Sequence, residues 1–518
     1  MGVDAAAVIR LRDEGKLDEA IERLRNEIAR DGGNEDAHYL HAQLLIEKGQ
    51  NEAAMGELLT TIRLNPNHSN AHKDLGFVYV LRESYQEAYD NFSKALILDR
   101  SNYGALRNLI ILLSQLRAKG QNLDPASVVK GHFPDGVRDI GAKQLPRNAE
   151  RALIIYVGDS IPWYLAGMLD LFPYLNSHTM FWETAEMVRL LNEHGYVVDY
   201  LDHNEENVDQ KIDYRSYKII VDAGTDNLSK FPPLAGQTRV FYSTGKHWLV
   251  ANIAGLERNR MFYQRHGIMM PAERQQKTNF DDEKADYLTY FGNTHQLEGY
   301  SPKAKKVPLN ISTVHIPVPR ERNIAAAKRH FIWLGGHAMI HKGLDLVVEA
   351  FAGMPEVFLH IAAYLEIEPE FLSWMRSFVA PYRNILYHGP ANVASPKFEE
   401  MAWGSLGTVY VSAAEGGPGS VAQLLHFGII PIVSRSSNVR AEGLCYVIEH
   451  EKDVEIIDAI RRYARELIAT PDEALLERSR QIREFALEHH TREAYSRSFR
   501  NLIEQVMAEE QLPSAVRA

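Results

Sequence analysis

The sequence predicts a multidomain protein in which an α-solenoid precedes two α/β domains. Three observations predict this fold class: a 34-residue helical repeat near the N-terminus, a connector without periodicity, and two successive series in which short apolar runs alternate with amphipathic segments. A chain of 518 residues also exceeds what one hydrophobic core usually organises, so about three domains are expected.

The helical repeat is marked by alanines at a constant spacing. Ala20, Ala54 and Ala88 are separated by 34 residues. Each is followed four positions later by a large apolar residue: Leu24, Leu58 and Phe92. Small residues surrounded by large ones suit two closely packed antiparallel helices, and Pro66 falls where one helical pair must end.

These features resemble the tetratricopeptide repeat (TPR) over roughly residues 1–102, and residues 105–116 predict a capping helix. We therefore expect a repeat domain over residues 1–119. The family uses the concave surface of such an array to hold a peptide or protein, so the resemblance implies a protein or peptide partner. The alternative is that the array only dimerises the chain or packs against its other domains.

Residues 120–148 contain scattered Pro and Gly and predict a linker. From RALIIYV onward, strand-like apolar runs alternate with helical patterns, and a second series begins at HFIWLGG. We predict two α/β domains with parallel sheets, over residues 149–325 and 326–518. Ligands of such sheets bind beyond the carboxyl ends of the strands, so the cleft between the halves is the expected site.

One turn of the second half suits an anionic ligand. In FIWLGGHAMIHKGLDLVVEAF, a predicted strand ends in Gly335 and Gly336, and Lys342 then precedes a helix. Glycines allow close approach of the backbone, while the lysine adds a full charge to the partial charge of the helix dipole. The turn therefore predicts a diphosphate site, although by itself it also fits a solvated lysine and a simple chain reversal.

A second turn, in VYVSAAEGGPGSVAQLLHF, carries polar groups of another kind. Glu415 lies at the carboxyl end of the predicted strand VYVS, and Gln423 lies eight residues later, about two helical turns on. Between them the turn enters a helix through small residues: Gly416, Gly417, Gly419 and Ser420. We predict that Glu415 and Gln423 bind the hydroxyl groups of a sugar or ribose. The alternative is a helix-capping acid and a surface amide.

The motifs LGG, HKGLDLVVEAF, NILYHGP, FEEMAWG and VYVSAAEGGPGSVAQLLHFGIIPIVS, in this order, resemble the donor-binding domain of GT-B glycosyltransferases, especially the retaining family 4 type. The resemblance implies two Rossmann-like domains, of which 149–325 is the acceptor side and 326–518 binds the nucleotide-sugar donor. It also implies that Lys342 contacts the donor diphosphate, Glu415 the donor sugar, and Ser420 with the neighbouring amides the phosphate side.

The sequence departs from the family pattern at two places. Gln423 stands where a second acid usually holds the ribose hydroxyls. An arginine that is common after the first strand of this domain is absent from GGHAMIH, which leaves His337 or His341 as substitutes.

The first α/β domain offers fewer candidates. His247 follows a predicted strand in FYSTGKHWLVANIAG and, by the resemblance, faces the donor sugar as a catalytic residue. His178 precedes a helix and is a second candidate. Arg258 and Arg260 are expected to be surface charges.

The resemblance implies a metal-independent, retaining hexosyltransferase that uses a nucleotide-sugar as substrate and needs no cofactor. No Asp-x-Asp triplet or zinc-binding His-Glu-x-x-His motif is present. The acceptor is expected to be a protein captured by the repeat array. Two alternatives are surface-polysaccharide or lipid-linked glycan synthesis, and a degenerate domain that serves as a scaffold. GPGSVA also fits a dinucleotide fingerprint, but the next strand lacks the ribose-binding acid, which disfavours an NAD enzyme.

Composition narrows the partners and the compartment. The net charge of -11 without a dense Lys/Arg block disfavours nucleic acid. Cys445 is the only cysteine, so no intrachain disulfide or cysteine-rich zinc site is expected, and a reducing cytoplasm fits. The N-terminal residues lack the apolar core of a secretory signal, and the most apolar stretch contains Asp159 and Asp170. We therefore expect a cytoplasmic protein with at most peripheral membrane contact.

Overall fold

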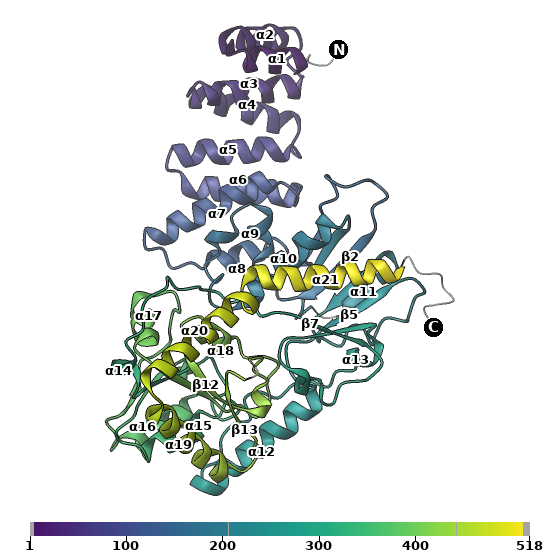
Figure 1. Cartoon of the computed structure of the whole chain (residues 1–518). Helices are drawn as coiled ribbons and strands as arrows, with labels where there is room; N and C mark the ends of the chain where they lie inside the picture. Colours follow the sequence, from purple (N-terminus) through teal and green to yellow (C-terminus); the bar gives the residue numbers. More distant parts are fainter. Residues whose placement is uncertain (1–4, 206, 442, 511–518) are drawn as a thin grey trace. The chain divides into compact units, whose positions relative to one another are not determined.

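The computed structural model describes residues 5–205, 207–441 and 443–510 (Figure 1). The chain divides into two compact units. One contains the residues up to 137 together with 159–175, and the other contains 138–158 together with the chain from 176 onward. Residues 159–175 therefore group with the helical array, although in sequence they lie inside the first α/β domain.

The first unit is a series of antiparallel helix pairs, and it confirms the predicted repeat. Ala20, Ala54 and Ala88 are completely buried. Pro66 follows the end of a helix at Leu64, and the predicted capping helix is present. The helices of this unit are α1 (Ala5–Asp13), α2 (Leu17–Arg30), α3 (Glu35–Glu47), α4 (Asn51–Leu64), α5 (Ser69–Leu81), α6 (Tyr85–Leu98), α7 (Tyr103–Ala118), α8 (Pro125–Lys130), α9 (Ile161–Leu165) and the 3-10 turn η1 (Leu169–Leu171).

The first α/β half contains, among the described residues, a seven-stranded sheet in the order β1-β3-β2-β4-β5-β6-β7, whose pairs from β3 to β7 are parallel. The linker expected over 120–148 contains α8 and the edge strand β1. The elements are β1 (Val137–Ile140), β2 (Arg151–Tyr156), α10 (Thr179–Glu193), β3 (Val197–Asp202), α11 (Val208–Lys211), η2 (Tyr214–Ser216), β4 (Ile219–Asp222), β5 (Thr238–Tyr242), α12 (Trp248–His266), α13 (Asp281–Lys284), β6 (Tyr287–Tyr290), η3 (Thr294–Leu297) and β7 (Lys305–Pro308).

The second half contains, within the described ranges, a six-stranded parallel sheet in the order β10-β9-β8-β11-β12-β13. Its elements are α14 (Ile324–Ala327), β8 (His330–Gly335), α15 (Leu344–Ala352), β9 (Phe358–Ala363), η4 (Leu365–Ile367), α16 (Pro369–Val379), β10 (Ile385–Tyr387), α17 (Pro396–Trp403), β11 (Gly407–Tyr410), α18 (Gly419–Leu425), β12 (Ile430–Ser434), η5 (Arg435–Ser437), β13 (Tyr446–Ile448), α19 (Asp453–Ala469), α20 (Asp472–His489) and α21 (Arg492–Glu510). An α-solenoid followed by two Rossmann-like halves is the predicted fold class.

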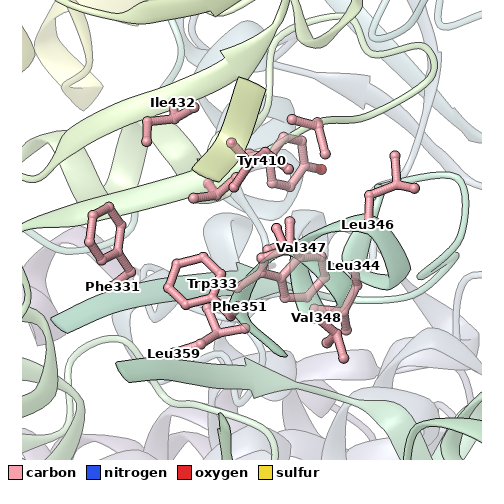
Figure 2. Packing of buried hydrophobic residues seen from close by; sticks show 14 of the residues in the cluster. Phe331, Trp333, Leu344, Leu346, Val347, Val348, Phe351, Leu359, Tyr410 and Ile432 are labelled. Atoms are coloured by element: carbon pink, nitrogen blue, oxygen red, sulfur yellow. The ribbon is translucent and has the colours of Figure 1, made fainter. Parts of the chain in front are cut away.

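The core of the second half forms where α15 covers the sheet. Trp333 of β8 and Leu359 of β9 are fully buried beside Val347 and Phe351 of α15 (Figure 2). The continuous apolar runs of these strands follow from burial of both faces of a parallel sheet. This packing fixes where β8 ends and where α15 begins, and therefore the position of the loop that joins them.

Both halves contribute helices to each other. Phe262 of α12 and Met270 after it lie in the hydrophobic core of the second half. In return, α21 packs along α10 of the first half (Figure 1). The hydroxyls of Tyr495 in α21 and Tyr242 in β5 lie 3.0 Å apart. These exchanges join the halves through buried surface.

A buried ion cluster connects α12 to the second half. Arg265 pairs with Asp345, with Asp453, and through Nε with Glu349 at 3.0 Å. Arg258 is 5% exposed and donates from Nη1 to the Val411 carbonyl at 3.1 Å. The expectation that Arg258 is a surface charge is therefore wrong, because α12 inserts between the halves; Arg260, paired with Glu257, is exposed as expected.

None of the helices in the described part of the chain combines the length and the apolar character needed to cross a bilayer.

Candidate functional site

The site residues predicted in the second half lie near the point where the strand order of its sheet reverses. β9 and β10 extend from one side of β8, and β11, β12 and β13 extend from the other. The loop after β8 and the loop after β11 therefore leave the sheet side by side and turn to opposite faces. Crevices at such reversal points are the usual ligand sites of parallel sheets.

The loop between β8 and α15 is held rigidly. Glu368 accepts a hydrogen bond from the Met339 backbone N–H at 3.1 Å and another from the preceding amide. Gly343 has φ +75°, and a Cβ at this position would lie 2.5 Å from the Val411 carbonyl oxygen, so only glycine fits. These contacts fix Lys342 immediately before α15.

Glu415 is a buried, ionised carboxylate. Its Oε1 accepts from the hydroxyl of Tyr410 at 3.1 Å and from Nη1 of Arg274 at 2.5 Å. Burial alone raises the pKa of Glu415, but the charges of Arg274 and Lys342 outweigh it and lower the pKa to about 2. The carboxylate therefore acts as a hydrogen-bond acceptor throughout the physiological pH range.

Lys342 shares this electrostatic environment. Burial lowers its pKa to about 8; Glu415 opposes the shift and the nearby Arg274 adds to it. In the part of the chain that the structure describes, the ammonium group makes no hydrogen bond or ion pair. The site thus holds a second cation that lacks a direct anionic partner.

Three histidines lie near these charges and are neutral at pH 7. Burial lowers the pKa of His178 to about 4, with Lys342 and Arg274 acting in the same direction. Burial also lowers the pKa of His341 to about 4 and lowers that of His337. Nδ1 of His178 accepts from the Met180 N–H at 3.3 Å, so the neutral ring carries its proton on Nε2. Nε2 of His341 donates to the Ala414 carbonyl at 2.7 Å.

The glycines after Glu415 allow two loops of the first half to approach closely. A Cβ at Gly416 would overlap the backbone of Thr244 and Gly245. Gly417 has φ +136°, and a Cβ there would lie 3.0 Å from that of Phe291. Close packing between the halves is therefore a sufficient reason for glycine at both positions.

The remaining small residues divide into two kinds. A Cβ at Gly335 would overlap the Trp333 ring, whereas Gly336 and Gly419 face open space. Ser420, at the start of α18, lies near the hydroxyl of Tyr410, which donates to Glu415. Gly336 and Gly419 are thus the glycines of these loops that leave room for a ligand.

Gln423 is occupied by the backbone. Its amide oxygen accepts from the His315 N–H at 3.1 Å, and its amide nitrogen donates to the His315 carbonyl. A contact with ribose would require these two bonds to be exchanged. In the structure, these two bonds hold the segment that connects the two halves against α18.

His247 lies in a different environment from His178. It is the residue immediately before α12. Its ring packs edge-on against Tyr300 at a centroid distance of 5.3 Å, and the charged groups that act on its pKa are Asp282 and Glu283. Of the two histidines proposed in the first half, His178 is the one whose pKa responds to Lys342 and Arg274.

Sequence reasoning missed three residues of the site. Tyr410 is an ordinary strand residue in the sequence, Glu368 follows an irregular segment, and Arg274 lies in MPAERQQKT, which has no motif. Only the folded chain brings Arg274 from the first half to Glu415 of the second. No feature of the amino-acid composition marks such a residue as part of the site.

Together these residues can bind an anion beside a polyhydroxylated group. Two cations supply the charge for the anion, while the ionised carboxylate and neutral imidazoles supply directional acceptors and donors. A pocket adjoins them, lined by the loop of residues 270–275, the loop of residues 338–341, and Glu368, Glu370 and Phe371.

One comparison with known proteins agrees with the repeat array. The tetratricopeptide repeat family matches residues 11–75. A comparison with curated proteins finds no match. Among solved structures, a mutant O-GlcNAc transferase of Thermobaculum terrenum is 15% identical, with 98% of each chain covered and a TM-score of 0.40. A glycosyltransferase of Rickettsia africae is 10% identical, with 69% of this chain and 99% of that chain covered and a TM-score of 0.45. The second TPR domain of human RPAP3, in complex with an HSP70 peptide, is 25% identical, with 21% and 90% covered and a TM-score of 0.20.

Proposed function

We propose that the chain is a glycosyltransferase that moves a sugar from a nucleotide-sugar donor to an acceptor. The observation that carries this proposal is the convergence of Lys342, Arg274 and Glu415 beyond the carboxyl ends of β8 and β11. A nucleotide-sugar carries a diphosphate and a sugar side by side. Paired cations next to one ionised carboxylate match that distribution of charge and hydroxyl groups.

In the proposed reaction, Lys342 stabilises the negative charge that develops on the departing nucleoside diphosphate. Glu415 accepts hydrogen bonds from the donor sugar and orients its anomeric carbon. The bond between this carbon and the diphosphate oxygen breaks, and a bond to the acceptor oxygen forms on the same face, with retention of configuration. The acceptor proton passes to the leaving diphosphate, and Lys342 takes the place of a metal ion in neutralising the charge of that group. His178 supplies a neutral N–H donor in the role that the family resemblance implies for His247.

The proposed acceptor is a protein or peptide held by the repeat array. Phe77 and Leu81 lie one turn apart on α5, and both are exposed although both are large and apolar. An apolar stripe on a TPR helix suits a peptide, and capture by the array raises the effective concentration of the acceptor. Surface-polysaccharide or lipid-linked glycan synthesis would instead use the array to dock an assembly partner.

The first test is a thermal-shift panel of UDP, GDP, ADP, CMP and NAD, with and without their common sugars. Binding to the folded state raises the melting temperature, and a ligand at 100 times its Kd stabilises by about 2.7 kcal/mol. We expect one nucleoside diphosphate to raise the melting temperature of the wild type but not of Lys342→Ala. If no ligand raises the melting temperature, the hypothesis of a degenerate scaffold domain replaces that of a transferase. If NAD alone raises it, the hypothesis of a dinucleotide-binding enzyme replaces that of a transferase.

The binding of that nucleoside diphosphate should weaken above pH 8. The ammonium form of Lys342 binds the anion, and burial lowers its pKa to about 8 in the free protein. Affinity should therefore be nearly constant below pH 7, fall about twofold between pH 7 and 8, and then fall by up to about tenfold per pH unit. Lys342→Arg, which stays charged, is the control and should show a flat profile in isothermal titration calorimetry. A wild-type profile as flat as that of the control would contradict the role of Lys342.

A further inference from the structure

Arg274 is one of the site residues that no sequence motif predicts. It lies in the segment between α12 and α13 of the first half and reaches Glu415 of the second half, with Nη1 2.5 Å from Oε1. It also lines the pocket formed by the loops of residues 270–275 and 338–341. The same side chain therefore contacts the predicted sugar-binding carboxylate and the adjoining pocket.

The two cations of the site have one carboxylate in direct contact, Glu415, which pairs with Arg274. Arg274 and Lys342 are two full cations, and they influence each other as like charges. Glu415 is a carboxylate shared between them. Glu368 accepts two backbone N–H groups, and its charge opposes the lowering of the Lys342 pKa without contacting the ammonium group. Glu273 and Glu370 line the adjoining pocket. The nearby histidines are neutral, and among the described residues Lys342 makes no direct ion pair.

We propose that Arg274 is a diphosphate-binding residue that exchanges partners when the donor binds. In the free protein its guanidinium neutralises Glu415. When the diphosphate enters between Arg274 and Lys342, the guanidinium turns to the phosphate oxygens, and Glu415 becomes free to accept hydrogen bonds from the sugar. This inference rests on the proposed function. According to this inference, a loop of the first half supplies the second cation for the diphosphate, which the GGHAMIH segment does not contain.

A guanidinium suits this exchange better than an ammonium group. It presents several N–H donors in a plane and can bind two phosphate oxygens at once. Because it stays protonated, the exchange involves no proton transfer. The competing explanation is that Arg274 only ties the two halves together, as Arg265 does. A purely structural arginine would affect the melting temperature of the free protein but not the affinity of the folded protein for a diphosphate.

The test compares Arg274→Gln, Arg274→Lys and the control Arg260→Gln in the full chain. Arg260 is an exposed arginine of α12 whose partner, Glu257, lies one turn away. Two probes are titrated by calorimetry: inorganic pyrophosphate, and whichever of UDP, GDP and ADP stabilises the wild type. We expect Arg274→Gln to weaken both by about 10- to 100-fold, Arg274→Lys to recover part of the loss, and Arg260→Gln to have no effect.

A second variant tests the exchange. Glu415→Gln removes the carboxylate that competes for Arg274, so pyrophosphate and the nucleoside diphosphate should bind at least as tightly as to the wild type, although sugar transfer is lost. Weaker diphosphate binding by Glu415→Gln would overturn the exchange. If the wild type binds the nucleoside diphosphate and Arg274→Gln binds it equally well, Arg274 is only structural and the proposed function stands. If the wild type binds no nucleoside diphosphate, both proposals fail.

Discussion

Replacing Glu415 by alanine is expected to reduce sugar transfer by about 10²- to 10³-fold while the protein stays folded. The loss follows from removal of an oriented acceptor in a buried site, where one preorganised hydrogen-bonding group commonly contributes this much. Transfer is measured by steady-state kinetics with the nucleotide-sugar identified by the ligand panel. The fall should appear in kcat more than in KM, because the contact orients the reacting carbon.

Two controls separate chemistry from stability. Glu449 is an exposed glutamate of the same half, paired with Arg435, and Glu449→Ala should retain full activity. Circular dichroism melting of Glu415→Ala checks that the loss of the Arg274 ion pair does not unfold the chain. A folded Glu415→Ala protein with nearly normal turnover would reject the role of this carboxylate.

Replacing Arg265 by methionine is expected to produce the largest loss of stability. Arg265 connects α12 to α15 and α19 by pairing with Asp345, which is completely buried, and with Asp453, which is nearly so. Arg258 of the same helix lies 3.6 Å from Asp453 but forms no ion pair with Asp345 among the described residues. Removal of one member of a buried ion pair leaves an uncompensated charge and costs about 3–5 kcal/mol. The melting temperature measured by calorimetry should fall strongly, whereas Arg260→Met, at an exposed position of the same helix, should change it little.

The loss of stability caused by Arg265→Met, relative to the wild type, should become smaller as the pH is lowered from 7 towards 5. Burial raises the pKa of Asp345, and Arg265 lowers it. Without the arginine, the folded state binds a proton at this carboxyl more readily than the unfolded state. The ionised carboxylate therefore destabilises the fold at neutral pH, and protonation at lower pH removes the penalty. An unchanged deficit across this range would assign the instability to lost packing instead of to charge.

The sequence by itself determined the architecture, because its patterns report local requirements. The 34-residue spacing of Ala20, Ala54 and Ala88 reflects helix pairs that contact only their neighbours, so each repeat specifies itself. Likewise, the turn before α18 places Glu415 and Ser420 at a strand end through chemistry that a few adjacent residues define. Lys342 was predicted in the same way, from a strand, a glycine pair and a helix start.

The tertiary structure decided how residues far apart in the sequence meet. Arg274 reaches Glu415 across 141 positions, and no period or motif predicts such a contact. Arg258 belongs to a helix that sequence places in the first half, yet it is buried because α12 inserts into the second. Gln423 has the spacing of a ligand contact, but the His315 backbone occupies its amide. Local patterns specify elements and turns, whereas burial, pairing of charges and the use of each polar group depend on which elements the completed core brings together.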